Sequence, residues 1–187
     1  MKIPFFNLER QTTQLKAELE EVSAAVFKSS QFVSGNFTKA FELEFAQYIG
    51  VSSCVSGGNA TDGLELVLRA MDIGDGDEVI VAAYTWISDA EAVRLVGATP
   101  IFVEVDSKNF NIDAKQVDGA ITTKTKAIIF THLFGYTEGF EEVEKVAEKH
   151  KLKLIEDCAQ AHGAAVNGKR AGGLGHAGVF SFYPTKN

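Results

Sequence analysis

The sequence predicts an α/β protein built on a mainly parallel β-sheet with helices on both faces. Short apolar segments have the length and composition of buried strands, and they span residues 79–81, 101–105, 127–130, 152–156 and 179–183. Segments whose apolar residues recur at helical spacing separate these strands, at residues 87–96, 113–121 and 138–150. Right-handed crossovers between parallel strands place helices against the sheet, so this alternation indicates a sheet covered on both sides.

The part of the chain before the first of these strands is predicted to be helical. Apolar residues recur at helical spacing within residues 11–28, and again from Phe41 to Tyr48, where Gly50 provides a favoured C-cap. A third helix is predicted after a turn of small residues, with an apolar face made of Leu64, Val67, Leu68 and Met71. No internal repeat or linker interrupts the chain, which therefore reads as one domain.

Composition and charge exclude several classes of function. The 187 residues carry a formal net charge of −7 without a basic run, which argues against a nucleic-acid or anionic-membrane surface. The histidines lack metal-ligand spacing and the two cysteines lie far apart, so no metal site is predicted. No segment has membrane-spanning length, and the N-terminus does not begin a signal peptide. These features indicate a cytoplasmic protein in which Cys54 and Cys158 are free, buried thiols.

A carboxylate and an amine follow two of the predicted strands. Asp157 ends the strand 152–156, and Lys186 follows the last strand, two residues after Pro184. Pyridoxal phosphate (PLP) requires these two groups from its protein: a lysine that forms a Schiff base, and an acid that keeps the pyridine nitrogen protonated. Each residue also has an ordinary interpretation, since Asp157 could cap the next helix and Lys186 could be a solvated surface lysine.

The turn from Gly57 to Asp62 is a candidate phosphate site. It follows a strand-like apolar segment at Cys54 and places Thr61 at the start of a helix, where backbone N–H groups and the helix dipole can hold an anion. An ordinary N-capped helix is the alternative, because Asn, Thr and Asp are favoured caps. Trp86, the single tryptophan, follows a strand and either stacks on a planar ligand or is a rim or core aromatic residue.

The segment Gly173–Gly178 matches the pattern G-x-G-x-x-G of dinucleotide-binding loops. In those proteins the pattern follows a strand and opens a helix. Here it follows a turn that contains Lys and Arg, and it leads into the strand 179–183. We therefore reject a dinucleotide site at this position.

In combination, these segments resemble the DegT/StrS family of PLP-dependent nucleotide-sugar aminotransferases. The resemblance extends from Ile3 to Asn187 and departs mildly from the family pattern at Ala60, where glycine is commoner, and at Thr131 and Phe134. The motifs that carry it are FELEFA at 41–46, NATDGL at 59–64, Thr85-Trp86, GATPIFVEVD at 97–106, THLFG at 131–135, EDCAQAHGA at 156–164 and FSFYPTKN at 180–187.

The resemblance implies a role for each site residue. Lys186 would be the Schiff-base lysine and the base that moves the substrate proton, and Asp157 would hold the pyridinium nitrogen. Gln160 would contact the side of the cofactor that carries the phenolic oxygen, and Trp86 would cover the ring face. The residues implied to hold the phosphate are Ala60, Thr61 and Ser181.

The resemblance also implies the architecture and the reaction. Residues 1–187 would be the truncated large, PLP-binding domain of a fold type I aminotransferase, with a small C-terminal domain beyond Asn187. The reaction would move an amino group from an amino acid, usually glutamate, to a nucleotide-linked keto-sugar, in a homodimer with shared active sites. Lysine at position 186 favours transamination over the dehydration of a related branch, which has histidine there.

Two other functional classes stay open. One is an NAD-linked sugar oxidoreductase, which would share the α/β sheet and the glycine pattern. The other is a non-catalytic or regulatory relative that keeps the fold. The sequence leaves the nucleotide, the sugar and the 3- or 4-position of the keto group undefined, because the residues that would contact them mostly lie outside this chain.

Overall fold

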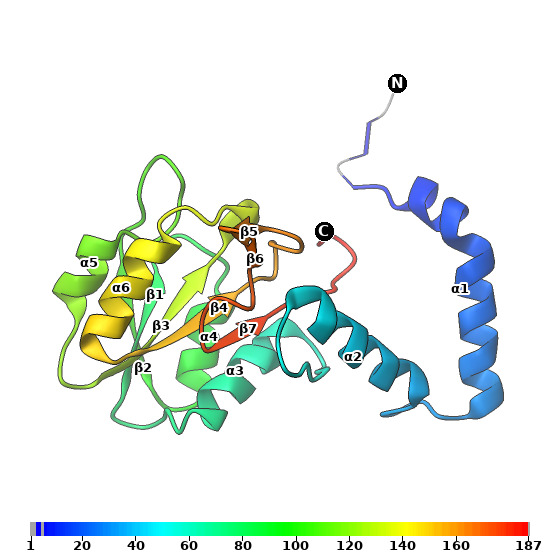
Figure 1. The fold of residues 1–187 in the computed structure, drawn as a ribbon, viewed down its shortest axis with the longest axis horizontal. Helices are drawn as coiled ribbons and strands as arrows, with labels where there is room; N and C mark the ends of the chain where they lie inside the picture. Colours follow the sequence, from blue (N-terminus) through cyan, green and yellow to red (C-terminus); the bar gives the residue numbers. More distant parts are fainter. Residues whose placement is uncertain (1–2, 5, 187) are drawn as a thin grey trace. The chain divides into compact units, whose positions relative to one another are not determined.

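The computed structural model describes residues 3, 4 and 6–186. The chain forms two compact units, one within residues 1–48 and 52–56 and the other within residues 49–51 and 57–187. Its helices are α1 (Glu9–Ser29), α2 (Asn36–Ile49), α3 (Ala60–Ala70), α4 (Ser88–Leu95), α5 (Ala114–Ala120), α6 (Phe140–His150) and the 3₁₀ turn η1 (Leu133–Gly135) (Figure 1). Its strands are β1 (Glu78–Ala82), β2 (Thr99–Val103), β3 (Thr125–Thr131), β4 (Lys153–Asp157), β5 (Ala165–Val166), β6 (Lys169–Arg170) and β7 (Ala177–Val179).

The first unit is helical, as its periodicity predicts. Within the described chain, α1 buries none of its side chains, and apolar residues such as Leu19 and Phe27 are exposed. Ser30 is the C-cap of α1. Its backbone is left-handed, and its N–H donates to the carbonyl groups of Val26 and Phe27 in the last turn. Glu42 of α2 fixes the loop that follows, because its Oε1 accepts the backbone N–H of Ser56 at 2.8 Å and the Ser56 hydroxyl at 2.6 Å.

Two predictions for this loop are wrong. Residues 51–59, all of them described, form no strand, so the turn 57–62 does not follow one. Cys54 is only partly buried, whereas Cys158 is fully buried as predicted. The physical reason is that Cys54 lies in an irregular loop held by the Glu42 side chain and not in a strand packed within a sheet.

The second unit contains the predicted sheet. Five strands of the described chain are parallel and lie in the order β2-β1-β3-β4-β7. α3 and α4 pack on one face while α5 and α6 pack on the other, so helices cover both faces (Figure 1). The chain runs from β1 outward to β2 and returns past β1 to β3, so the strand order reverses between β1 and β3. Ligands of such sheets bind beside this point, at the carboxyl ends of the strands.

Two apolar clusters join the sheet to its helices. Successive side chains of a strand point to opposite faces, so Val79 and Val81 of β1 pack with α3 and α4, while Ile80 packs with α5 and α6. The second cluster contains Phe130 of β3 and Phe140 of α6, whose rings meet edge to face with centroids 5.2 Å apart. Both clusters position the carboxyl ends of the strands relative to the helices that follow them.

The last strand ends earlier than predicted. β7 covers Ala177–Val179 and not 179–183, and its final pair joins Val179 to Asp157 of β4. Because β4 itself ends at Asp157, β7 has no partner backbone beyond this pair. Phe180 and Phe182 pack instead on the ring of His162, with centroids 5.3 and 5.1 Å from it.

A buried carboxylate holds the segment Gly173–Gly178 against β4. Glu156 Oε1 accepts two backbone N–H groups of this segment at 2.8 and 2.7 Å, and its Oε2 accepts the N–H of Gly172 at 2.7 Å. The Nε2 atom of His132 lies 2.9 Å from Oε2, and both side chains are fully buried. The glycine pattern therefore surrounds a carboxylate of the protein and leads into β7, which confirms that it is not a dinucleotide loop.

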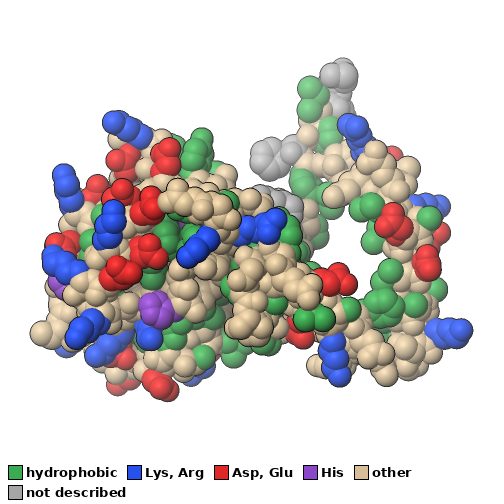
Figure 2. Space-filling view, in the orientation of Figure 1, with side chains coloured by type: hydrophobic (Ala, Val, Ile, Leu, Met, Phe, Trp, Pro, Cys, Tyr) green, Lys and Arg blue, Asp and Glu red, His purple; other side chains and the backbone are tan. Residues whose placement is uncertain are grey.

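Charged side chains of both signs are interspersed around α5 and α6 (Figure 2). Asp118 of α5 accepts hydrogen bonds from Lys149 at 3.0 Å and pairs with His150 of α6 at 2.7 Å. These two contacts, that of Lys149 first, hold the pKa of Asp118 below its ordinary value. In the part of the chain that the structure describes, no helix combines the length and apolarity needed to cross a membrane.

Leu64→Ala should lower the free energy of unfolding by about 2–5 kcal/mol, because the deleted side chain is completely buried between α3 and the sheet. Leu66→Ala, on the exposed side of the same helix, should change it by less than about 0.5 kcal/mol. Urea unfolding followed by circular dichroism measures both. Equal losses in the two variants would contradict this packing.

Glu156→Gln should destabilise the protein by about 1–3 kcal/mol. In the wild type both carboxylate oxygens accept backbone N–H groups, and in the variant the NH₂ group replaces one of these acceptors with a donor. Exchange of the amide protons of Gly172 and Leu174, followed by NMR, should accelerate. Glu148→Gln, on the exposed side of α6, is the matched control and should leave that exchange unchanged. Slow exchange in Glu156→Gln would show that the carboxylate does not hold the loop.

Candidate active site

Asp157 and the segment that carries Lys186 lie at one edge of the sheet. Asp157 ends β4, and residues 180–186 follow β7, the strand that pairs with β4. Asp157 is 5% exposed, and its Oδ1 accepts the N–H of Ala159 at 2.9 Å. Burial raises the pKa of Asp157, while the Ala159 N–H, then Asp89 of α4, and then the electrostatic influence of Lys186 and His132 oppose that rise. The Lys186 ammonium is therefore close enough to act electrostatically on the buried carboxyl group.

His162 is a further group beside Lys186. Both of its ring nitrogens are buried and have no hydrogen-bond partner among residues 3, 4 and 6–186. Phe180 and Phe182 hold the imidazole from two sides. Burial first, and then the charge of Lys186, lowers the pKa of His162, which favours the neutral imidazole.

The starts of α3 and α4 meet through two hydroxyl groups. The Oγ1 atom of Thr61 lies 2.8 Å from the Oγ atom of Ser88, which brings two helix N-termini together. Both helix dipoles favour an anion there. Asn59 caps α3 by accepting the N–H of Asp62 at 2.9 Å, so the capping alternative is observed as well and is compatible with an anion at Thr61.

Close packing places the first turn of α3 beside the end of β7. A Cβ atom on Gly63 would lie 2.8 Å from the Val179 side chain, so only glycine permits this approach. Ala60, in the same turn, packs against the apolar cluster that includes Val179. Ser181 follows Val179 by two residues, and its hydroxyl accepts the N–H of Tyr183 at 3.3 Å. Among the described residues, no hydrogen bond joins Thr61 to Ser181.

Trp86 and Gln160 flank the same edge. Trp86 lies in the loop after β1 with its indole 70% exposed, which excludes the core interpretation and leaves the ring available for stacking. Gln160 Oε1 accepts the N–H of Phe134 at 2.9 Å. Phe134 has a left-handed backbone (φ 56°), a conformation that non-glycine residues rarely adopt and that this hydrogen bond supports.

These groups fit pyridoxal phosphate. The cofactor has a ring nitrogen that requires an acid, an aldehyde that requires an amine, and a phosphate that requires donors. Asp157, Lys186 and the paired hydroxyls of Thr61 and Ser88 supply these three kinds of group along one edge of the sheet. Buried polar atoms without partners among the described residues, such as Thr85 Oγ1, show that this edge has hydrogen-bonding capacity to spare.

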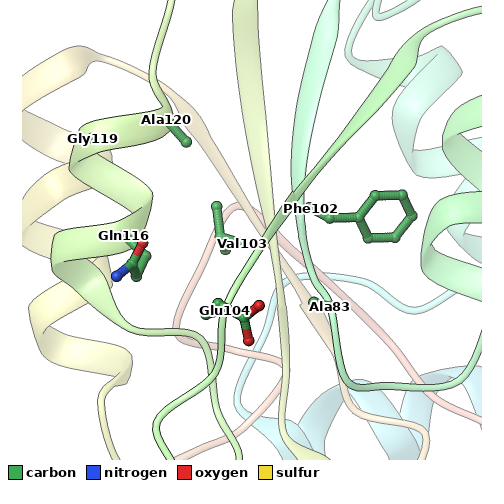
Figure 3. Close-up of a pocket in the computed structure, with 7 residues that line it drawn as sticks. All are labelled: Ala83, Phe102, Val103, Glu104, Gln116, Gly119 and Ala120. Carbon is green, nitrogen blue, oxygen red and sulfur yellow. The ribbon is translucent and has the colours of Figure 1, made fainter.

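A separate cavity of about 330 Å³ lies where β1, β2 and α5 meet. Figure 3 shows the side chain of Phe102 on the opposite side of β2 from Val103, as expected from alternation along a strand. None of the predicted site residues lines this cavity, whose walls are Ala83, Phe102, Val103, Glu104, Gln116, Gly119 and Ala120.

The sequence analysis predicted no role for four residues at this edge: Ser88, Asp89, His132 and His162. Asp89 is fully buried, and its Oδ2 accepts the hydroxyl of Thr131 at 2.5 Å. The sequence did contain a signal for Asp89. It is a carboxylate on the apolar side of α4, whose Ala90, Ala92 and Val93 are also buried. The two histidines lie within the motifs 131–135 and 156–164 that carry the resemblance, but their partners are distant in sequence, so no role was predicted for them.

Comparison with known proteins identifies the family of the chain. The chain is 43% identical over all 187 residues to the "pleiotropic regulatory protein" of Geobacillus stearothermophilus, of which it covers 50%. It is 44% identical over 96% of its length to the dTDP-3-amino-3,6-dideoxy-alpha-D-galactopyranose transaminase of Aneurinibacillus thermoaerophilus, again covering 50%. The chain thus spans about half the length of the curated relatives it matches.

Solved structures give the same result. Streptomyces venezuelae DesV, in complex with a ketimine intermediate, superposes with a TM-score of 0.94 at 38% identity, over 99% of this chain and 50% of DesV. The PLP form of the sugar aminotransferase Spr1654 from Streptococcus pneumoniae gives 0.87 at 31% identity, over 91% of this chain and 47% of its own. The profile of the DegT/DnrJ/EryC1/StrS aminotransferase family matches residues 13–187. The predicted resemblance and fold class are therefore confirmed, and the chain belongs to the DegT/DnrJ/EryC1/StrS aminotransferase family.

Proposed function

We propose that this chain is the cofactor-binding part of a PLP-dependent aminotransferase that moves an amino group from glutamate to the keto group of a nucleotide-linked sugar. The observation that carries the proposal is the buried carboxyl of Asp157 under the electrostatic influence of Lys186. The names of two relatives, a dTDP-sugar transaminase and a UDP-sugar aminotransferase of Acidithiobacillus ferrooxidans, support the substrate class. Bound PLP supplies an aldehyde that takes up amino groups and a ring that accepts electrons.

Each residue of the chain has a defined task in this proposal. Lys186 holds the cofactor covalently through its amine and afterwards moves the substrate proton. Asp157 would hold the protonated ring nitrogen of the cofactor, and the N–H that it accepts from Ala159 favours its charged form. Trp86 covers one face of the ring. Gln160 approaches the phenolic oxygen while its Oε1 supports the backbone at Phe134.

The phosphate is assigned to the corner where α3 and α4 begin. Ala60 and Thr61 contribute the start of α3, and Ser181 contributes a hydroxyl from the segment after β7. The contact between the hydroxyls of Thr61 and Ser88 supports this assignment, because it gathers two donors where two helix dipoles favour negative charge.

A non-catalytic regulatory protein is the second candidate, because the Geobacillus stearothermophilus relative is named a pleiotropic regulatory protein. The presence of Asp157, Gln160 and Lys186 together supports catalysis instead, since regulation alone requires none of them. An NAD-linked oxidoreductase has lost its main support, because the backbone N–H groups of the segment Gly173–Gly178 donate to Glu156.

The proposal includes a homodimer with shared active sites, a cytoplasmic location and a large domain formed by residues 1–187. The resemblance to the family supports the dimer and the domain. A panel of nucleotide keto-sugars, tested with the whole protein and glutamate, would identify the nucleotide, the sugar and the position of the keto group.

Lys186→Ala should abolish covalent attachment of PLP, because the amine that binds the aldehyde carbon is removed. Borohydride reduction of the loaded protein, followed by peptide mass spectrometry, should add the cofactor mass to the peptide that contains Lys186 in the wild type and to no peptide in the variant. Lys169→Ala, on the exposed hairpin, should label as the wild type does. A label that survives in Lys186→Ala would assign the wrong lysine.

The PLP-loaded protein should lose its yellow absorption on addition of glutamate and release one 2-oxoacid per active site, because the amino group passes to the cofactor. Absorption spectroscopy with a 2-oxoacid assay measures both. A regulatory protein would bind PLP without converting glutamate, and an NAD enzyme would not become yellow. Either result would reject the proposed reaction.

A further inference from the structure

A second buried acid, Asp89, lies next to Asp157 and has no task in the proposed function. It comes from the first turn of α4 and is completely buried. Its Oδ2 accepts the hydroxyl of Thr131, the last residue of β3. Thr131 pairs in register with Asp157 of β4, so the Asp89 carboxyl reaches the pair of strand ends where Asp157 lies.

The surroundings of the two acids differ. Asp157 accepts a backbone N–H from Ala159 and is under the electrostatic influence of the Lys186 ammonium after β7 and, less strongly, of His132 after β3. Asp89 accepts the neutral hydroxyl of Thr131, and the hydroxyl of Thr85 is the other group that lowers its pKa. The Oδ1 atom of Asp89 is buried and has no hydrogen-bond partner in the described chain. The donors around the pair therefore favour a negative charge on Asp157 over one on Asp89.

Two adjacent carboxylates closed off from water cannot both stay ionised at low cost. Burial first, and then the negative charge of Asp157, raises the pKa of Asp89 well above its ordinary value. The dipole at the start of α4 favours the charged form of Asp89, but this effect is small beside the loss of hydration at a fully buried position. The two acids therefore titrate as a coupled pair, in which the charge left by the first ionisation disfavours the second.

We propose that Asp89 is a positioning residue that keeps its proton and shares it with Asp157, so that the pair carries a single negative charge located on Asp157. The Asp89 carboxyl group would carry the proton and direct it toward Asp157, and the Asp157 carboxylate would be oriented and kept ionised by it. This inference rests on the proposed function only for the identity of the ligand group that Asp157 faces, the ring nitrogen of PLP. The location of the proton does not depend on the cofactor.

The first test is infrared difference spectroscopy of the cofactor-free whole protein between about pH 5 and pH 9. A buried carboxylic acid should give a C=O band at neutral pH in the wild type. Asp89→Asn should lose this band and Asp157→Asn should retain it. A band that disappears in Asp157→Asn and remains in Asp89→Asn would place the proton on Asp157 and overturn the proposal.

The second test is the pH dependence of unfolding of the same cofactor-free protein. A carboxyl whose pKa is higher in the folded chain stabilises it at low pH, and this contribution is lost as the pH rises from the unfolded value through the folded one. His162, whose pKa is lowered, acts in the opposite sense in every variant, so the proteins are compared with one another. The fall in urea midpoint from about pH 5 to pH 9 should be smaller in Asp89→Asn than in the wild type by more than about half. An unchanged fall in Asp89→Asn would overturn the proposal.

Asp118→Asn is the matched control, because it makes the same chemical change at an exposed acid. The pKa of Asp118 lies below its ordinary value, so this group is already ionised in the folded and unfolded chain above about pH 5. Its variant should keep the wild-type fall. If PLP fails to bind while both tests locate the proton on Asp89, the proposed function fails and the proton assignment stands. If PLP binds and Asp89 carries no proton, only this inference fails.

Discussion

Burial of the carboxyl group of Asp157 is the constraint on which the site depends. A carboxylate with 5% exposure is unfavourable unless nearby groups stabilise its charge. The end of β4 provides the N–H of Ala159, and the neighbouring strand ends bring His132 and Lys186 into electrostatic reach. A planar cation such as a protonated pyridine ring would complete this environment, because its charge would stabilise the buried carboxylate.

Parallel strand pairing produces this arrangement from residues far apart in sequence. Thr131, Asp157 and Val179 are in register at the carboxyl ends of β3, β4 and β7, so the loops that follow these strands converge. Glu156 sets the position of β7, because it binds the backbone of the glycine-rich segment that leads into this strand. The carboxylate that holds this segment and the carboxyl group of the candidate site therefore occupy adjacent positions of β4, pointing to different sides of the sheet.

Membership in the aminotransferase family and the geometry of the site support each other. The family comparison covers residues 13–187, and the site lies entirely within the second compact unit. The glycine-rich segment shows why a motif needs its structural context: the same letters that cradle a pyrophosphate in one fold surround Glu156 in this one. The carboxylate and lysine at neighbouring strand ends are more informative, because their chemistry matches the cofactor that the relatives use.

The sequence by itself determined the alternation of strands and helices, the parallel sheet and the order of the motifs, because apolar periodicity and the sequence patterns that carry chemistry are local properties. It also indicated Asp157 and Lys186 together, since both follow apolar runs. Only the tertiary structure decided where β7 ends, because β4 offers no partner beyond Asp157. It alone placed Asp89 against Thr131 and Glu156 against its loop, since hydrogen bonds between residues 16 to 42 positions apart leave no local pattern.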